Sequence, residues 1–145
     1  MSHGQSVCVV TGGSLGIGLA VCHTFSENDY RVINLDVRDF DDTPTNAEWV
    51  ACDVSSMEQV RHAIDNIAVK YGRIDALVCN AGMHVSATIE DTDEALLDKI
   101  MSLNIKGAYG AIKASLPTMK AQKSGAIVVM GSDQCFVGKQ NSLDL

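Results

Sequence analysis

Five short apolar runs are spread along the chain, and three longer segments between them have apolar residues at helical spacing. The short runs are continuous rather than alternating, which is typical of strands buried on both faces of a sheet. The expected strands are residues 7–10, 31–36, 48–52, 74–79 and 126–130. The pattern therefore predicts a protein in which strands and helices succeed one another.

The three helical segments carry recognisable start and stop signals. Ser55 and Glu58 form a capping box at the start of the second segment, and Gly72 ends it. The third segment runs from Asp93 to about Lys123, and we expect Pro117 to kink it near its end. The first helical segment follows the first strand and ends near residues 27–29. Its apolar face has residues at helical spacing: Ile17, Ala20, Val21, Thr24 and Phe25.

Alternating strands and helices predict a single α/β domain with a doubly wound parallel sheet and right-handed crossovers. Ligands of such sheets bind outside the carboxyl ends of the strands, at the point where the strand order reverses. Five residues suited to ligand binding fall just past strand ends: Gly12, Asp36, Asp53, Asn80 and Ser132. Their positions predict one shared site.

Glycines are concentrated in Thr11-Gly-Gly-Ser-Leu-Gly-Ile-Gly18, where the first strand turns into the first helix. Glycine permits positive φ and a close backbone approach to a ligand. The backbone N–H groups of the first helical turn favour an anion, and a pyrophosphate is the obvious one. The alternative is a tight strand–helix turn that binds nothing.

An acid, Asp36, closes the second expected strand, 18 residues after Gly18. A carboxylate at this place can accept hydrogen bonds from both hydroxyls of an adenosine ribose. It also repels a 2′-phosphate, at a cost on the order of 1–4 kcal/mol for like charges about 4 Å apart. We therefore expect NAD rather than NADP, although Arg38 would soften this preference. The alternative is a solvated loop carboxylate.

Composition narrows the classes of partner. The formal net charge is −7 and no cluster of basic residues occurs, which argues against nucleic acid and anionic membranes as partners. No apolar run approaches the roughly 20 residues of a membrane span, and the N-terminus lacks the features of a signal peptide. The five cysteines form no C-x-x-C pair and are interpreted as reduced, with no metal site. We expect a cytoplasmic protein.

The order of these motifs resembles the classical short-chain dehydrogenase/reductase family over residues 6–132, and this implies a Rossmann-type fold. The resemblance implies that Ser132 hydrogen-bonds the substrate oxygen and that Asn104 holds a water in a proton relay. Asn104 lies on the apolar side of its helix, where a buried amide needs partners; it could instead bond local backbone. The implied cofactor-binding residues are Gly12, Ser14, Leu15, Gly16, Ile17, Gly18, Asp36, Asp53, Val54, Asn80, Ala81 and Gly82.

The family's catalytic tyrosine and lysine have no counterpart at the expected place. Counting from Ser132, the tyrosine would fall at Leu145, the last residue. Tyr109 and Lys113 have the family's spacing but lie inside the third helical segment, which we interpret as coincidence. The last four residues, 142–145, resemble the end of the family's catalytic helix. We therefore expect residues 1–145 to form an incomplete dinucleotide-binding domain, truncated after the fifth strand. An internal deletion, a frameshifted or truncated gene, or a sequence that covers only part of a longer chain would each explain this.

Two functions remain open. The first is an oxidoreductase that transfers a hydride between NAD(H) and a small secondary alcohol or ketone. The second is a nucleotide-binding remnant or interaction module without catalysis, because the tyrosine and lysine are absent. The third helical segment would expose an apolar stripe, which predicts association, and the resemblance implies a homo-oligomer, a dimer or a tetramer.

Overall fold

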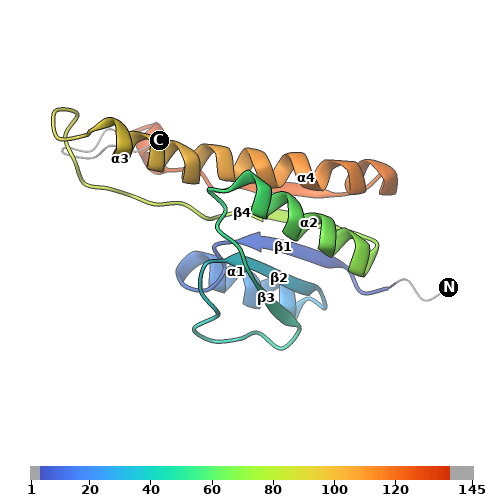
Figure 1. Ribbon diagram of the computed structural model, residues 1–145. Coiled ribbons are helices and arrows are strands. Elements are labelled where there is room, and N and C mark those ends of the chain that lie inside the picture. The colour runs from blue at the N-terminus through green and yellow to red at the C-terminus, as the bar shows by residue number, and fades with distance from the viewer. Residues whose placement is uncertain (1–3, 138–145) are drawn as a thin grey trace.

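Five parallel strands form one sheet in the computed structural model, which describes residues 4–137 (Figure 1). Their bounds are β1 Val7–Thr11, β2 Arg31–Asp36, β3 Ala47–Ala51, β4 Ala76–Cys79 and β5 Ala126–Val129. The strand order is β3-β2-β1-β4-β5, and every neighbouring pair is parallel. The order reverses between β1 and β4, so the predicted doubly wound α/β sheet of Rossmann type is confirmed.

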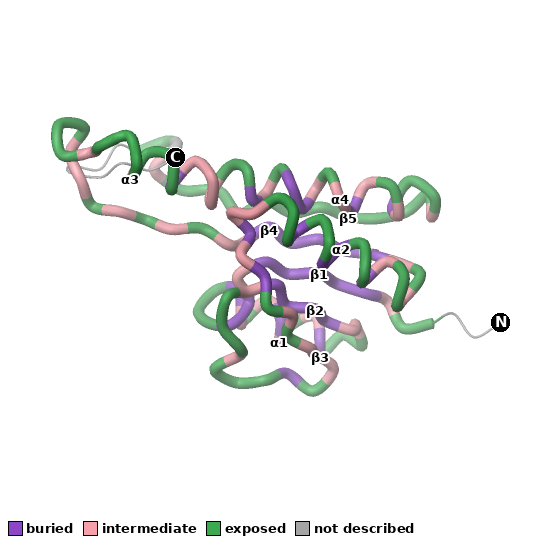
Figure 2. Tube along the Cα trace, in the orientation of Figure 1, coloured by how far each residue is buried: buried purple, intermediate pink, exposed green. Residues whose placement is uncertain are grey.

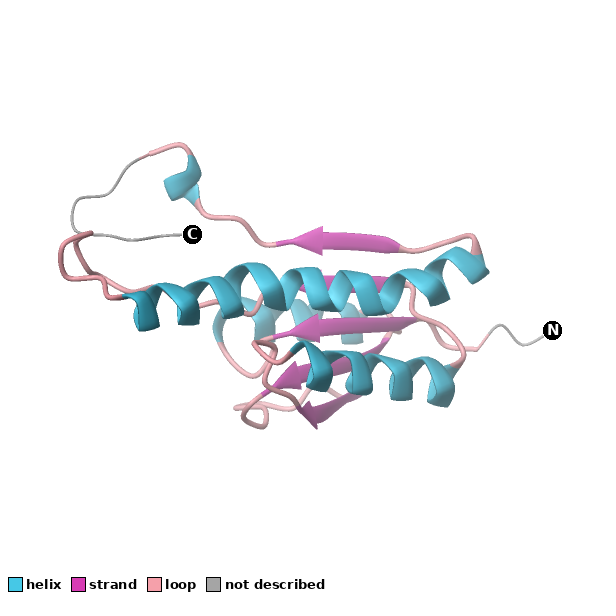
Figure 3. Cartoon of the chain, turned by 45° about the horizontal axis from the view of Figure 1, so that its top comes forward, coloured by secondary structure: helices cyan, strands magenta, loops and turns pink. Residues whose placement is uncertain are grey.

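Helices lie on both faces of this sheet (Figures 1 and 3). The helix α1, Gly16–Glu27, lies on one face, and α2, Met57–Tyr71, and α4, Gly107–Gln122, lie side by side on the other. A short helix α3, Glu94–Ile100, lies beyond the carboxyl edge of the strands. In the described residues, no helix has both the length and the apolar character that a membrane span requires.

Two hydrophobic clusters fill the space between the layers. Val9 and Ile33 belong to the larger cluster, beneath α2 and α4, whereas Val10 and Val32 belong to the smaller one, beneath α1. The alternation arises because successive side chains of a strand point to opposite faces of the sheet. The central strands are consequently buried on both faces, as the continuous apolar runs predict (Figure 2).

The strand β5 departs from that prediction. All four of its residues are exposed, and Val128 and Val129 are 50% and 54% exposed. The strand pairs with β4 along one edge, and in the described residues no strand pairs with its other edge. An apolar run therefore indicates a strand here without indicating how far it is buried.

The face that α1 turns to the sheet differs in part from the predicted one: Val21 and Phe25 pack against the smaller cluster, as their spacing predicts, but the fully buried positions are others. Gly18, Cys22 and Ser26 are its buried residues, whereas Ile17, placed on the apolar face by spacing, is 65% exposed. Small side chains face the strands because the helix starts in close contact with the β1 turn. A Cβ added at Gly18 would lie 2.1 Å from the carbonyl oxygen of Gly12.

The cap of α2 lies one residue later than predicted. The side chain of Ser56, not of Ser55, accepts the hydrogen bond from the Gln59 backbone N–H. Ser55 is engaged elsewhere, because its own N–H and hydroxyl both donate to Oδ1 of Asp53, at 2.9 and 2.7 Å. The turn after β3 therefore decides which serine caps the helix.

The third helical segment is continuous along its length but not in its hydrogen bonding. Between α3 and α4, residues Met101–Lys106 form a π-helix, and α4 then continues through Pro117 to Gln122. The expected exposed apolar stripe is seen only in part: Leu97, Ile105 and Tyr109 are exposed. Ile100 is buried, and Leu103 and Ile112 pack against the larger cluster. The tail, 142–145, lies outside the described residues.

Candidate functional site

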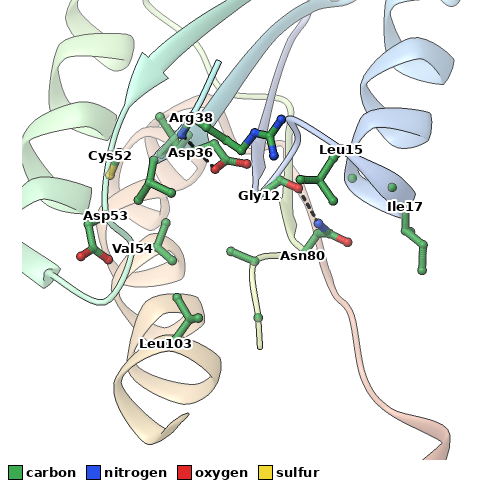
Figure 4. A pocket seen from close by; sticks show the side chains of 16 residues that line it. Gly12, Leu15, Ile17, Asp36, Arg38, Cys52, Asp53, Val54, Asn80 and Leu103 are labelled. Atoms are coloured by element: carbon green, nitrogen blue, oxygen red, sulfur yellow. Dashed lines mark hydrogen bonds between the residues drawn. The ribbon is translucent and has the colours of Figure 1, made fainter. Parts of the chain in front are cut away.

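A cavity of about 460 Å³ opens at the carboxyl edge of the sheet, where the strand order reverses (Figure 4). This volume lies within the range of small-molecule sites. All the predicted cofactor-binding residues except Ser14 line the cavity. The structure thus gathers residues from the ends of β1, β2, β3 and β4 at one place. The lining residues that the site prediction omitted are Leu35, Val37, Arg38, Cys52 and Leu103.

The glycine turn is shaped by two kinds of requirement. Gly12 and Gly16 have φ of +68° and +58°, a conformation that side chains disfavour. Gly18 is required for space: an added Cβ would meet Gly12 O and lie 2.5 Å from Nδ2 of Asn80. The same Nδ2 donates to Gly12 O at 2.8 Å, which ties the turn to the end of β4. The turn is therefore held closed by the close approach of Gly18 to Gly12 O and by the side-chain amide of Asn80.

The N-terminus of α1 faces this cavity without a side-chain cap. Leu15 occupies the N-cap position and makes no side-chain hydrogen bond there, and the first turn holds no acidic residue. In contrast, Ser56 caps α2 and Asp93 caps α3. Because the first-turn N–H groups of a helix carry partial positive charge, this end can hold an anion.

The Asp36 carboxylate is fixed at the cavity wall by backbone donors on both oxygens. Its Oδ2 accepts from Ser14 N–H at 3.1 Å and its Oδ1 from Arg38 N–H at 3.3 Å. Its own carbonyl oxygen accepts from the Trp49 indole N–H at 2.9 Å and from Cys52 N–H at 3.0 Å. The acid is thus oriented before any ligand arrives.

Ser14 differs from the expectation that it contacts the pyrophosphate. It is fully buried and does not line the cavity. Its hydroxyl accepts from Nδ2 of Asn34 at 2.8 Å and donates to the Arg38 carbonyl at 2.5 Å. Asn34 is itself fully buried, and its Oδ1 accepts from Gly13 N–H at 2.7 Å. Ser14 and Asn34 therefore hold the glycine turn in place from the protein interior, without lining the cavity.

The ends of β3 and β4 complete the wall. The Thr11 hydroxyl accepts from the N–H groups of Asn80 and Ala81, both at 3.1 Å, which braces β4 against β1. At the β3 end, burial raises the pKa of the Cys52 thiol to about 11, and the charge of Asp53 contributes. Cys52 is therefore a neutral wall residue at pH 7.

The two predicted catalytic residues lie outside the cavity lining. Asn104, in the π-helix, accepts from Met83 N–H at 2.8 Å and donates to Met83 O at 3.0 Å, so its side chain holds the segment after β4. Ser132 is exposed after β5, where its hydroxyl accepts from Gln134 N–H at 3.1 Å. None of the three tyrosines lines the cavity.

No group of three or more His, Cys, Asp or Glu side chains in residues 4–137 is arranged to hold a metal ion. The four cysteines with described side chains, Cys8, Cys22, Cys52 and Cys79, are free and buried.

Comparison with known proteins places this site in context. A family model described as short chain dehydrogenase matches residues 6–143. The 3-oxoacyl-[acyl-carrier-protein] reductase FabG of Thermotoga maritima is 31% identical over 135 residues, which cover 87% of this chain and 55% of that protein. Tropinone reductase-like 2 of Erythroxylum coca is 29% identical over 136 residues, covering 87% of this chain and 50% of that protein.

Solved structures agree with the fold. The ligand-free aldohexose dehydrogenase of Thermoplasma acidophilum superposes with a TM-score of 0.90 at 33% identity, over 95% of this chain and 53% of that chain. The structure of ElxO with NADP bound gives a TM-score of 0.86 at 31% identity, over 94% and 59%. The chain spans about half the length of the relatives it matches.

Proposed function

The chain belongs to the short-chain dehydrogenase family, and on that premise we propose that its cavity binds NAD(H). We further propose that the whole protein transfers a hydride between NAD(H) and a small secondary alcohol or ketone. Oxidoreductases of this family use NAD or NADP, so the choice between them is the first part of the proposal. The nicotinamide, when bound, supplies or accepts the hydride.

One observation carries the preference for NAD. Asp36 lines the cavity with its carboxylate held by Ser14 N–H and Arg38 N–H. A carboxylate fixed in this way can accept from the two hydroxyls of an adenosine ribose, and it opposes a 2′-phosphate. The remaining lining fits the rest of the molecule. The uncapped start of α1 suits the pyrophosphate, and the wall with Val54 and Leu103 suits the adenine.

Catalysis is the second part of the proposal. Ser132 would bind the substrate oxygen, and Asn104 would take part in the proton relay through its helix segment. In the structure, the amide of Asn104 fixes the Met83 backbone next to Gly82, a cavity residue. We also propose that the protein is cytoplasmic and that it is a homo-oligomer. The exposed apolar side chains of β5 favour association.

A binding module without catalysis is the second candidate. It is favoured by the placement of Ser132 and of all three tyrosines away from the cavity lining. Hydride transfer to a carbonyl is assisted by an acid at the developing alkoxide, which contributes roughly 10²–10⁴-fold. The two candidates share the cofactor site and differ only in turnover.

Titration with NADH tests the shared claim. Trp49 is the only tryptophan, and its indole N–H donates to the carbonyl of Asp36, so energy transfer from Trp49 to bound NADH reports occupancy of this cavity. Replacing Asp36 by asparagine removes a charged acceptor worth about 1.5–3 kcal/mol and raises the Kd for NADH by about 10–100-fold.

Asp39→Asn is the matched control, because Asp39 lies in the same loop, loses the same charge and does not line the cavity. Its Kd for NADH should stay within about twofold of the unmodified chain. Equal Kd values for the unmodified chain and the Asp36→Asn variant would contradict the cofactor proposal. A screen of secondary alcohols with NAD then separates the two candidates: turnover favours the oxidoreductase, and binding without turnover favours the module.

A further inference from the structure

A cation lies at the wall of the cavity, beside the acid proposed to select NAD. Arg38 is the only lysine or arginine among the residues that line it. Its backbone N–H donates to Asp36, and Figure 4 shows the two side chains together. An arginine at this position of a dinucleotide fold can accommodate a 2′-phosphate. By itself, Arg38 would therefore counteract the preference that Asp36 imposes.

The Arg38 guanidinium is engaged by another residue. Its Nη2 forms an ion pair with Oδ1 of Asp41, three residues along the chain. Both side chains are about half exposed, at 55% and 53%. Asp41 does not line the cavity, so it acts on the site through the arginine.

The backbone around the pair is fixed against the glycine turn. Ser14 donates its hydroxyl proton to the Arg38 carbonyl and accepts, at its own carbonyl, from Asp41 N–H at 3.0 Å. Ser14 is fully buried and is held in turn by Asn34. Both partners of the ion pair are thus anchored to one rigid residue, which keeps them facing one another.

We propose that Asp41 is a specificity-determining residue, which withholds Arg38 from a 2′-phosphate and so enforces NAD over NADP. The inference rests on the proposed function, because it concerns the same cofactor. Asp41 acts in two ways, and both weaken the binding of a 2′-phosphate. It neutralises the cation that a 2′-phosphate needs, and it adds a second negative charge near Asp36.

The expected effect is moderate because the pair is exposed. Exposed ion pairs shift equilibria by about 1.5–5-fold, and removal of the negative charge adds to this for a doubly charged phosphate. We therefore expect Asp41→Asn to tighten NADPH binding by about 3–10-fold. Binding of NADH, which has no 2′-phosphate, stays within about twofold. The backbone N–H of Asp41 and its hydrogen bond to Ser14 are kept in this variant.

The experiment measures Kd for NADH and for NADPH, by Trp49 energy transfer, in the full chain and three variants. Asp41→Asn should raise the ratio of NADH Kd to NADPH Kd, and Asp39→Asn, with the same loss of charge in the same loop, should not. The double variant Arg38→Gln/Asp41→Asn should lose most of the gain, because the part that comes from freeing the arginine is removed and only the loss of the Asp41 charge remains.

Three results would overturn the proposal: an unchanged ratio in Asp41→Asn, an equal change in Asp39→Asn, or a full gain without Arg38. Each of these still allows the chain to bind NADH. Absence of binding to either cofactor in the unmodified chain would instead overturn the proposed function, and this inference with it.

Discussion

Replacement of Gly18 by alanine tests the close contact between the glycine turn and the start of α1. The added Cβ would lie 2.1 Å from Gly12 O, which is backbone and cannot rotate away, and 2.5 Å from Nδ2 of Asn80. The turn must open, and the Asn80–Gly12 hydrogen bond, 2.8 Å long, is lost or stretched. Overpacking costs about 1–3 kcal/mol and the hydrogen bond about 0.5–1.5 kcal/mol. We expect the free energy of unfolding to fall by about 2–4 kcal/mol.

Urea denaturation followed by Trp49 fluorescence measures this change, because Trp49 is the only tryptophan and lies on β3, paired with β2. Gly16→Ala is the matched control. Gly16 also has a positive φ, of +58°, but an added Cβ there would have nothing within 4 Å. Only backbone strain of about 1–2 kcal/mol is then expected.

The comparison of the two alanine variants is decisive. Gly18→Ala should unfold at a clearly lower urea concentration than Gly16→Ala, or accumulate as insoluble protein under conditions where Gly16→Ala folds. If Gly18→Ala is as stable as the unmodified chain, the β1–α1 contact is looser than described. The reasoning about the turn would then be refuted.

Two further predictions concern a buried polar contact and a partly buried one. Asn34→Ala leaves the buried N–H of Gly13 without its acceptor, so the free energy of unfolding should fall by about 2–4 kcal/mol in urea denaturation; a loss below about 0.5 kcal/mol would contradict the positioning role. For Asp75, burial alone raises the carboxyl pKa, but hydrogen bonds from Arg73 and from Val7 N–H outweigh it and the pKa is lowered. Its stabilisation is therefore present above the unfolded pKa of about 3.9 and is lost as pH falls through the folded pKa. Between pH 7 and about pH 2–3, the free energy of unfolding should fall less for Asp75→Asn than for the unmodified chain, as measured by urea denaturation. An identical fall in both proteins would contradict the proposed contribution of Asp75.

The sheet could be predicted from sequence because its signal is local. Continuous apolar runs followed by helical spacing indicate a doubly wound sheet whatever the details of packing. The exposure of β5 could not be predicted in this way. Its run, Ala126–Val129, is as apolar as that of β1, and only its place at the edge of the sheet distinguishes the two.

Site residues on strand ends were predictable because topology alone brings them together. Asp36 and Asn80 follow strands, and parallel strands end at the same edge of the sheet. Buried residues that hold the site in place without lining the cavity were not predictable. Asn34 interrupts an apolar strand, but its partners lie 20 and 21 residues away and become neighbours only through the β1–β2 pairing. The burial of Ser14 follows from the same contact.

Local competition between polar side chains was also beyond the sequence pattern. The sequence Ser55-Ser-Met-Glu58 fits a capping box. However, the Ser55 hydroxyl donates to the Asp53 carboxylate, and Ser56 caps the helix instead. Likewise, helical spacing puts Ile17 on the apolar face of α1, but close contact at Gly18 turns the helix so that Ile17 lines the cavity, where the family resemblance expects it. In both cases a neighbouring contact outweighs a pattern.

The most direct test of the central claim is where NAD binds on the chain. Backbone amide NMR spectra of the uniformly ¹⁵N-labelled full chain, titrated with NAD, report every N–H that changes its surroundings. We predict that the changes concentrate at Gly12–Gly18, at Asp36–Arg38, at residues 53–54 and at residues 80–82, the elements that line the cavity. Saturating changes elsewhere, for example along β5 with the cavity residues unmoved, or no change at millimolar NAD, would contradict the account.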